Sequence, residues 1–87
     1  MEINIRFQWL SPGEVRPTDE FPDGEAPGTV KKVDEYIPIP GVGDFVSFVG
    51  PSYKVRSRHF NKLSRGWFIT IVVENATDEE VMAALRE

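Results

Sequence analysis

The chain has 87 residues, with ten Lys and Arg against fourteen Asp and Glu and a formal net charge of −4. This length makes one small domain, which buries about 60 to 65% of the surface of its unfolded chain. The absence of cysteine excludes disulfide bonds and thiolate metal sites. No apolar run approaches the ~18 residues of a membrane helix and no signal-peptide pattern opens the chain, so we expect a cytoplasmic protein without membrane contact.

The first expected element is a strand over residues 2–10, EINIRFQWL. Apolar and polar residues alternate along it, which places Ile3, Ile5, Phe7 and Trp9 on one face. Residues on one face of a strand are two apart, so the pattern predicts a strand with one buried and one solvent-exposed face.

Residues 11–28 change character, with four prolines, three glycines and five acids. This composition buries little apolar surface, so it predicts a long, partly disordered loop in which Phe21 is a candidate anchor. Residues 29–40 return to strand character. Pro38 and Pro40 have no backbone N–H to donate, so they predict a sheet edge that is blocked against further strand addition.

The stretch over residues 42–74 predicts three consecutive antiparallel strands. Each is rich in Val, Ile, Phe and Tyr, and Gly, Pro, Ser and Asn gather between them. In the last strand Trp67, Ile69, Ile71 and Val73 share the expected core face. The predicted strands cover 44–49, 53–60 and 67–74, with a turn at 50–52 and a longer loop at 61–66.

A helix over about residues 77–86 is expected to end the chain. Thr77 is a favourable N-cap, and Glu80 three residues later completes a capping box. Val81, Ala84 and Leu85 form an apolar stripe, and a helix this short needs docking to persist.

These elements predict one domain over residues 1–87: a mainly β fold, a small SH3-like five-stranded antiparallel barrel with a short C-terminal α-helix. The run GDFVSFVGPSYKVRSRHF resembles the pattern Gly-Asp-x-Val, a turn, then Tyr-x-Val-x-x-Arg of small SH3-like bacterial and phage proteins of uncharacterised role. The resemblance covers residues 40–74 and implies a fold without an activity. The predicted core comprises Ile3, Ile5, Phe7, Val46, Phe48, Tyr53, Val55, Ile69, Ile71, Val73, Val81 and Leu85.

Catalytic residues are scarce. His59 is the only histidine, and the serines stand in no nucleophile motif. The carboxylates of the acidic loop lack the fixed separation that acid–base chemistry needs. We therefore expect neither an enzyme nor a bound cofactor or metal, and we interpret His59 as an ordinary strand residue.

The charges are segregated along the chain. Residues 50–73 hold five basic residues and no acid, whereas the rest of the chain sums to −9. Strict alternation places Lys54, Arg56 and Arg58 on one strand face with Phe60 in line. The predicted binding residues are Lys54, Arg56, Arg58, Phe60, Arg65, Trp67 and Phe68.

Three interpretations of this basic segment remain open. As part of a noncatalytic interaction module, it would bind a protein partner or a second copy of the chain through aromatic and arginine contacts. In a nucleic-acid binder, the same residues would grip phosphates and stack bases. Alternatively, the acidic loop or the first turn of the helix folds over the segment and neutralises it internally.

Overall fold

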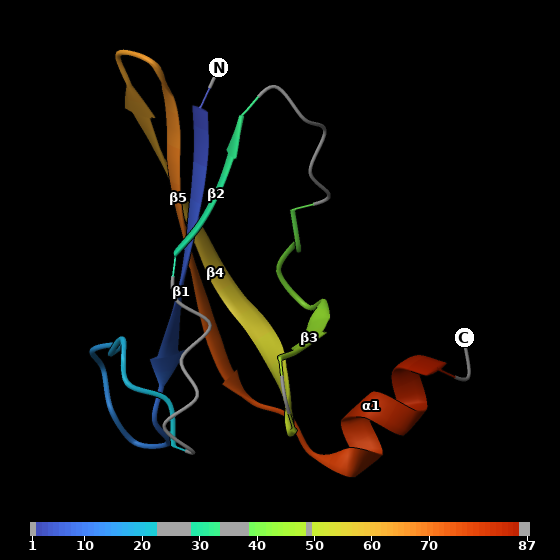
Figure 1. The fold of residues 1–87 in the computed structure, drawn as a ribbon. Helices are drawn as coiled ribbons and strands as arrows, with labels where there is room; N and C mark the ends of the chain where they lie inside the picture. The colour runs from blue at the N-terminus through green and yellow to red at the C-terminus, as the bar shows by residue number, and fades with distance from the viewer. Residues whose placement is uncertain (1, 23–28, 34–38, 49, 86–87) are drawn as a thin grey trace.

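A computed structural model describes residues 2–22, 29–33, 39–48 and 50–85 of the chain. The described elements confirm a mainly β fold with one short helix at the end of the sequence (Figure 1). Their bounds, in chain order, are β1 (Glu2–Leu10), β2 (Thr29–Val33), β3 (Phe45–Ser47), β4 (Ser52–Leu63), β5 (Gly66–Asn75) and α1 (Asp78–Leu85).

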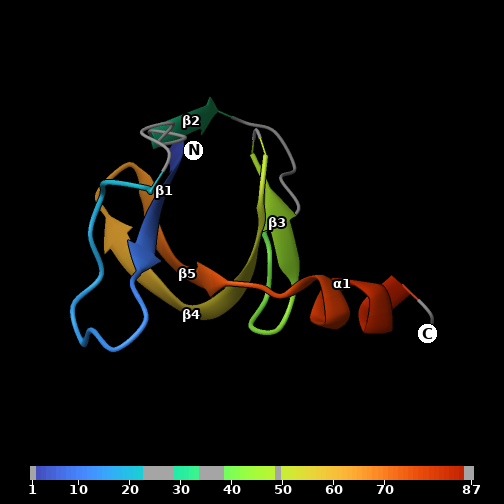
Figure 2. The same cartoon turned by 90° about the horizontal axis from the view of Figure 1, so that it is seen from below.

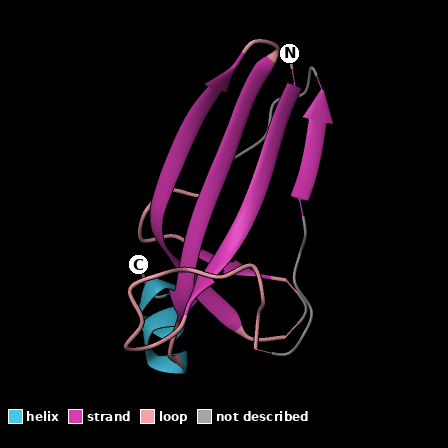
Figure 3. Cartoon of the chain, turned by 90° about the vertical axis from the view of Figure 1, so that its left-hand side faces the viewer, coloured by secondary structure: helices cyan, strands magenta, loops and turns pink. Residues whose placement is uncertain are grey.

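The strands form one curled sheet in the order β2-β1-β5-β4-β3. Seen end-on, the sheet is a half-barrel with β2 and β3 at its edges (Figure 2). Its long strands lie side by side, and α1 sits at one end of them (Figure 3). The prediction of an all-antiparallel barrel is wrong, because β1 and β5 run parallel from Glu2 beside Gly66 to Leu10 beside Glu74.

Each segment predicted to be a strand contains one, but the bounds of the strands differ from the prediction. β4 continues to Leu63, so the hairpin between β4 and β5 turns through Ser64 and Arg65 rather than through a loop over 61–66. β2 ends at Val33, and Pro40 lies outside any strand. The other half of the predicted proline edge, Pro38, falls outside the described residues.

The core lies on the concave face of the half-barrel. β1 and β5 place their alternate apolar residues on this face in paired rows, Ile5 beside Ile69 and Phe7 beside Ile71. Both strands are central in the sheet, so these side chains have neighbours on either side. The buried core residues are Ile5, Phe21, Tyr53, Val55, Ile69, Ile71 and Val73.

Phe21 joins this core from the long loop. Its ring meets Phe48 and Tyr53 edge-on, with ring centroids 5.7 and 5.4 Å away, and Phe7 meets Phe48 at 4.9 Å. Edge-on aromatic pairs stabilise beyond their buried area. The candidate anchor of the sequence is thus a core residue, although the predicted core omits it.

Two further contacts fix the described part of the loop to β1. Thr18 and Trp9 exchange backbone hydrogen bonds of 2.8 and 2.9 Å. On the convex face, the guanidinium of Arg6 donates from Nε and Nη2 to both carboxylate oxygens of Asp19, at 2.8 and 2.7 Å. These contacts and Phe21 give residues 11–22 more fixed points than their composition predicts.

The Arg6–Asp19 contact predicts a specific acid sensitivity. The Arg6 hydrogen bonds hold the pKa of the Asp19 carboxyl below its ordinary value. A carboxyl with a lowered folded-state pKa stabilises the fold above its unfolded value of about 4, and this contribution is lost as the pH falls through the folded value. Asp19→Asn should therefore make the loss of stability below about pH 4 less steep.

Urea midpoints measured from neutral pH down to about pH 2 test this expectation. The matched control is Glu14→Gln, which removes a carboxylate of the same loop that makes no hydrogen bond or ion pair with any described residue. Its curve should follow the wild type. Parallel curves for Asp19→Asn and the wild type would contradict the assigned contribution.

The helix begins as its sequence predicts. Thr77 Oγ1 accepts a hydrogen bond from the backbone N–H of Glu80 at 3.1 Å, and the Glu80 carboxylate accepts one from the N–H of Thr77 at 3.2 Å. That backbone hydrogen bond lowers the pKa of Glu80. The predicted docking is wrong: α1 buries none of its residues, and Leu85 is 77% exposed. Val81 is only partly buried, so neither helix residue belongs to the core.

Gly66 marks a close approach of β1 to β5. A Cβ at this position would meet the main-chain oxygen of Glu2 and lie 2.7 and 2.8 Å from its C and N atoms. No side-chain rotation relieves a clash with backbone, so Gly66→Ala should cost about 1–3 kcal/mol of unfolding free energy by displacing β1. Urea unfolding measures this loss. In the control Gly41→Ala, the added Cβ would lie 3.4 Å from the Asp44 Oδ2, and a similar loss there would contradict the argument.

Candidate functional site

A β-bulge divides β4 at Arg56. Val55 lies opposite Val73 of β5, but Ser57, two residues later, lies opposite Val72, so Arg56 has no counterpart. An extra residue in one strand shifts the alternation of its side chains by one position. Before the bulge the odd-numbered residues of β4 face the core, and after it the even-numbered residues do.

The bulge separates the predicted binding residues onto two faces. Lys54 lies opposite Glu74 on the convex face, whereas Arg58 lies opposite Ile71 and Phe60 opposite Ile69 on the concave face. The prediction that Lys54, Arg56 and Arg58 share one face is therefore wrong. The sequence carries the missed signal, because the apolar residues change phase from Tyr53 and Val55 to Phe60 within one strand.

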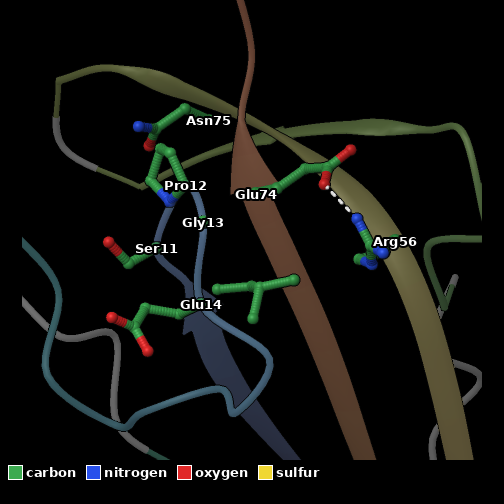
Figure 4. A pocket seen from close by; sticks show the side chains of 8 residues that line it. Ser11, Pro12, Gly13, Glu14, Arg56, Glu74 and Asn75 are labelled. Atoms are coloured by element: carbon green, nitrogen blue, oxygen red, sulfur yellow. Dashed lines mark hydrogen bonds and ion pairs between the residues drawn. The ribbon is translucent and has the colours of Figure 1, made fainter.

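The two convex-face cations of β4 are neutralised within the chain. Arg56 Nη1 donates to the Glu74 carboxylate at 2.9 Å (Figure 4), and Lys54 Nζ lies 3.5 Å from the Glu80 carboxylate in the first turn of α1. Neutralisation by the first turn of the helix thus holds for Lys54 only, because Arg56 is paired by Glu74 of β5. Exposed ion pairs of this kind contribute little to stability, yet they leave these two cations less available to a ligand.

The concave-face cations stand beside aromatic rings. The Arg58 guanidinium carbon lies 5.3 Å from the Phe60 ring centroid, and Lys62 Nζ lies 5.3 Å from the Trp67 ring centroid. Phe60 and Trp67 meet edge-on at 6.3 Å. We call Arg58, Phe60, Lys62 and Trp67 the cation–aromatic row.

The β4 residues of the row lie at an open edge of the sheet, whereas Trp67 is half-buried against the core on the central strand β5. β3 pairs only with Ser52–Lys54, and Gly43 and Asp44 extend the backbone bonding to Val55. Beyond Val55, no described residue pairs with the side of β4 that faces away from β5. Phe60 is 44% exposed as a result, whereas its neighbour Ile69 on β5 is buried.

The cations of the row have no acidic partner in the described part of the chain. Neither Arg58 nor Lys62 forms an ion pair with a residue of ranges 2–22, 29–33, 39–48 or 50–85. Lys62 was counted in the basic segment but not among the predicted binding residues. The structure adds it, because the bulge brings it opposite Trp67.

The two remaining predicted binding residues lie apart from the row. Phe68 points to the convex face, opposite Asn61, and is half-buried. Arg65 lies in the hairpin turn, where its backbone carbonyl accepts a hydrogen bond from the Glu2 N–H at 3.0 Å. Its side chain is exposed.

A shallow hollow of about 200 Å³ lies near the start of the loop (Figure 4). Arg56 and Glu74, which line it, form an ion pair with each other. His59 lies elsewhere, on the convex face opposite Thr70. His59 is therefore not part of this hollow. Its lining residues are Leu10, Ser11, Pro12, Gly13, Glu14, Arg56, Glu74 and Asn75.

The described residues contain no group of three or more His, Asp or Glu side chains that could hold a metal ion. The described part of the chain also has no helix long and apolar enough to cross a membrane.

Comparison with protein families, curated proteins and solved structures finds no match to this chain.

Proposed function

We propose that the protein is a noncatalytic interaction module that binds another protein chain through the cation–aromatic row. The observation that carries this proposal is the exposure of Phe60 on the concave face, edge-on to Trp67 and between two cations without described acidic partners. Aromatic side chains and arginine dominate the binding energy of protein interfaces.

A structural role alone explains part of this arrangement. Charged residues on an edge strand discourage unwanted strand pairing. This role alone would explain the presence of Arg58 and Lys62 without any binding partner. Edge protection does not explain why Phe60 is 44% exposed on the same face, edge-on to the half-buried Trp67. Covering these rings would bury apolar area, and the cations would direct an acidic partner onto them.

Nucleic-acid binding is the second candidate, and the cation–π geometry favours it. Aromatic rings flanked by Lys and Arg stack bases and contact phosphates in single-strand binders. The acidic balance of the whole chain opposes it, because nucleic-acid-binding domains are usually basic. Salt separates the candidates, since phosphate contacts weaken steeply with added salt.

An SH3-like identity of the half-barrel stays part of this proposal. Its support is the motif over residues 40–74. The binding proposal does not require it, because the row is defined by the bulge and by the strand edge.

The test compares two double charge reversals on the same strand. Arg58→Glu with Lys62→Glu removes the cations of the row, and Lys54→Glu with Arg56→Glu makes the same charge change on the convex face. We expect the first variant to lose most of the partner recovered by wild-type protein from a native lysate, and the second to retain it.

Equal recovery by both variants would overturn the proposal. The nucleic-acid candidate is tested by titrating the wild-type protein with single-stranded and duplex oligonucleotides at low and moderate salt. Tight, salt-sensitive binding that only the Arg58 and Lys62 reversal removes would favour that candidate over a protein partner.

A further inference from the structure

We infer that the occupant of the cation–aromatic row is helix α1 of a second copy of the chain. This inference rests on the proposed function and names its partner. Two copies would exchange helices, so that each α1 lies on the row of the other copy.

Within the described part of the chain, α1 is covered only lightly: Glu80 pairs with Lys54 and Val81 is partly buried. None of its eight residues is buried, and Met82 and Leu85 are 52% and 77% exposed. Isolated helices shorter than about 12 residues are marginal in water, so the capping box and the Lys54–Glu80 ion pair are weak support for this one. A surface that covers Met82 and Leu85 would stabilise it.

The exposed side of α1 complements the row in chemistry. Asp78 and Glu79 precede Met82 by four and three residues, and Leu85 follows three residues later, so all four lie along one side of the helix. Two carboxylates followed by two apolar side chains match a surface of two cations beside two aromatic rings. The acids would meet Arg58 and Lys62 while the apolar residues cover Phe60 and Trp67.

The helix of the same chain lies at the opposite end of β5 from Lys62 and Trp67 of the row. Trp67 and Asn75 stand at opposite ends of β5, eight residues or about 26 Å apart. Only Ala76 and Thr77 separate Asn75 from α1, and the three steps from Asn75 to Asp78 span at most about 11 Å. The backbone of Asp78 therefore stays roughly 15 Å from that of Trp67, which lies opposite Lys62. Figure 1 shows α1 at the far end of the sheet from the β4–β5 turn.

A second copy removes this restriction. A two-fold axis perpendicular to β5 relates two copies whose β5 strands run in opposite directions. The α1 end of each copy then lies beside the row of the other copy. Such an interface is closed and uses the same two surfaces twice. One eight-residue helix makes a small contact, and two contacts in one dimer act together.

The experiment measures the mass of the full chain in solution by sedimentation over a range of concentrations. The helix variant is Met82→Lys with Leu85→Lys, which removes the apolar contact and adds repulsion from the row. The row variant is Arg58→Glu with Lys62→Glu. The control is Val15→Lys with Val42→Lys, the same charge change at two exposed apolar residues outside both surfaces. Circular dichroism establishes that each variant is folded.

We expect the wild type and the control to dimerise. The association constants of the helix variant and of the row variant should each be lower by about tenfold or more. An equimolar mixture of the two variants should regain dimers. Each mixed dimer pairs one wild-type helix with one wild-type row, and its other contact sets the new lysines against the new glutamates.

A monomeric wild type, a dimer that persists in either variant, or a mixture that remains monomeric would overturn the inference. These results are distinct from failure of the proposed function. If the wild type is monomeric but partner recovery still depends on Arg58 and Lys62, the interaction module stands with a different partner.

Discussion

Phe21→Ala is expected to lower the free energy of unfolding by about 3–5 kcal/mol. Phe21 is only 5% exposed, and its ring contacts Phe48 and Tyr53 edge-on. Truncation would remove the apolar transfer energy, leave a cavity between the loop and the core and eliminate both ring contacts. It would also release the described part of the loop from one of its fixed points.

Urea denaturation of the full chain measures the effect, and Phe60→Ala is the matched control. Phe60 undergoes the same chemical change at a position that is 44% exposed on an edge strand, so its loss should be clearly smaller. Equal losses at the two positions, or a negligible loss at Phe21, would show that Phe21 is not part of the folded core.

Local sequence patterns predicted the parts of this fold that depend on neighbouring residues. The alternation in β1 fixes Ile5 and Phe7 on the core face, because the period of a strand is two. The capping box at Thr77 and Glu80 likewise needs only residues three apart. In both places the local preference and the folded structure agree.

The errors arise where distant segments decide the outcome. Nothing local to β1 and β5 states that they pair in parallel, since that depends on the path of the whole chain between them. The burial of Phe21 depends on Phe48 and Tyr53, which follow it by 27 and 32 residues. Composition correctly describes its loop as poor in apolar residues, yet one aromatic side chain with two aromatic neighbours is enough to tie the loop to the core.

The candidate site combines both situations. The segregation of basic residues was visible in the sequence, but their division between two faces depends on the bulge at Arg56. Strict alternation fails wherever one residue is added to a strand, because every later side chain changes face. The position of Phe60 relative to Val55 was the local sign of this shift, and Lys62 entered the site through it.

Ile71→Ala should be the other strongly destabilising change, with a loss of about 2–5 kcal/mol in the free energy of unfolding. Ile71 is 0% exposed, beside Phe7 of β1 and in a central strand, so the surrounding backbone cannot easily collapse into the space left by the truncation. Urea unfolding at neutral pH measures the loss. The adjacent Val72, half-buried on the convex face, supplies the control Val72→Ala with a smaller expected loss.

The same substitution connects the core with the row. Ile71 lies opposite Arg58, and Ile69 lies opposite Phe60. Both isoleucines are buried, so they are the cross-strand neighbours of two residues of the row. Truncation of Ile71 should weaken binding at the row even under conditions where the variant remains folded, because Arg58 and Phe60 would no longer be held in one arrangement. A stable Ile71→Ala variant with a small loss of unfolding free energy would refute the core position of Ile71. A large loss accompanied by unchanged binding of the folded fraction would show that the row is positioned by β4 alone.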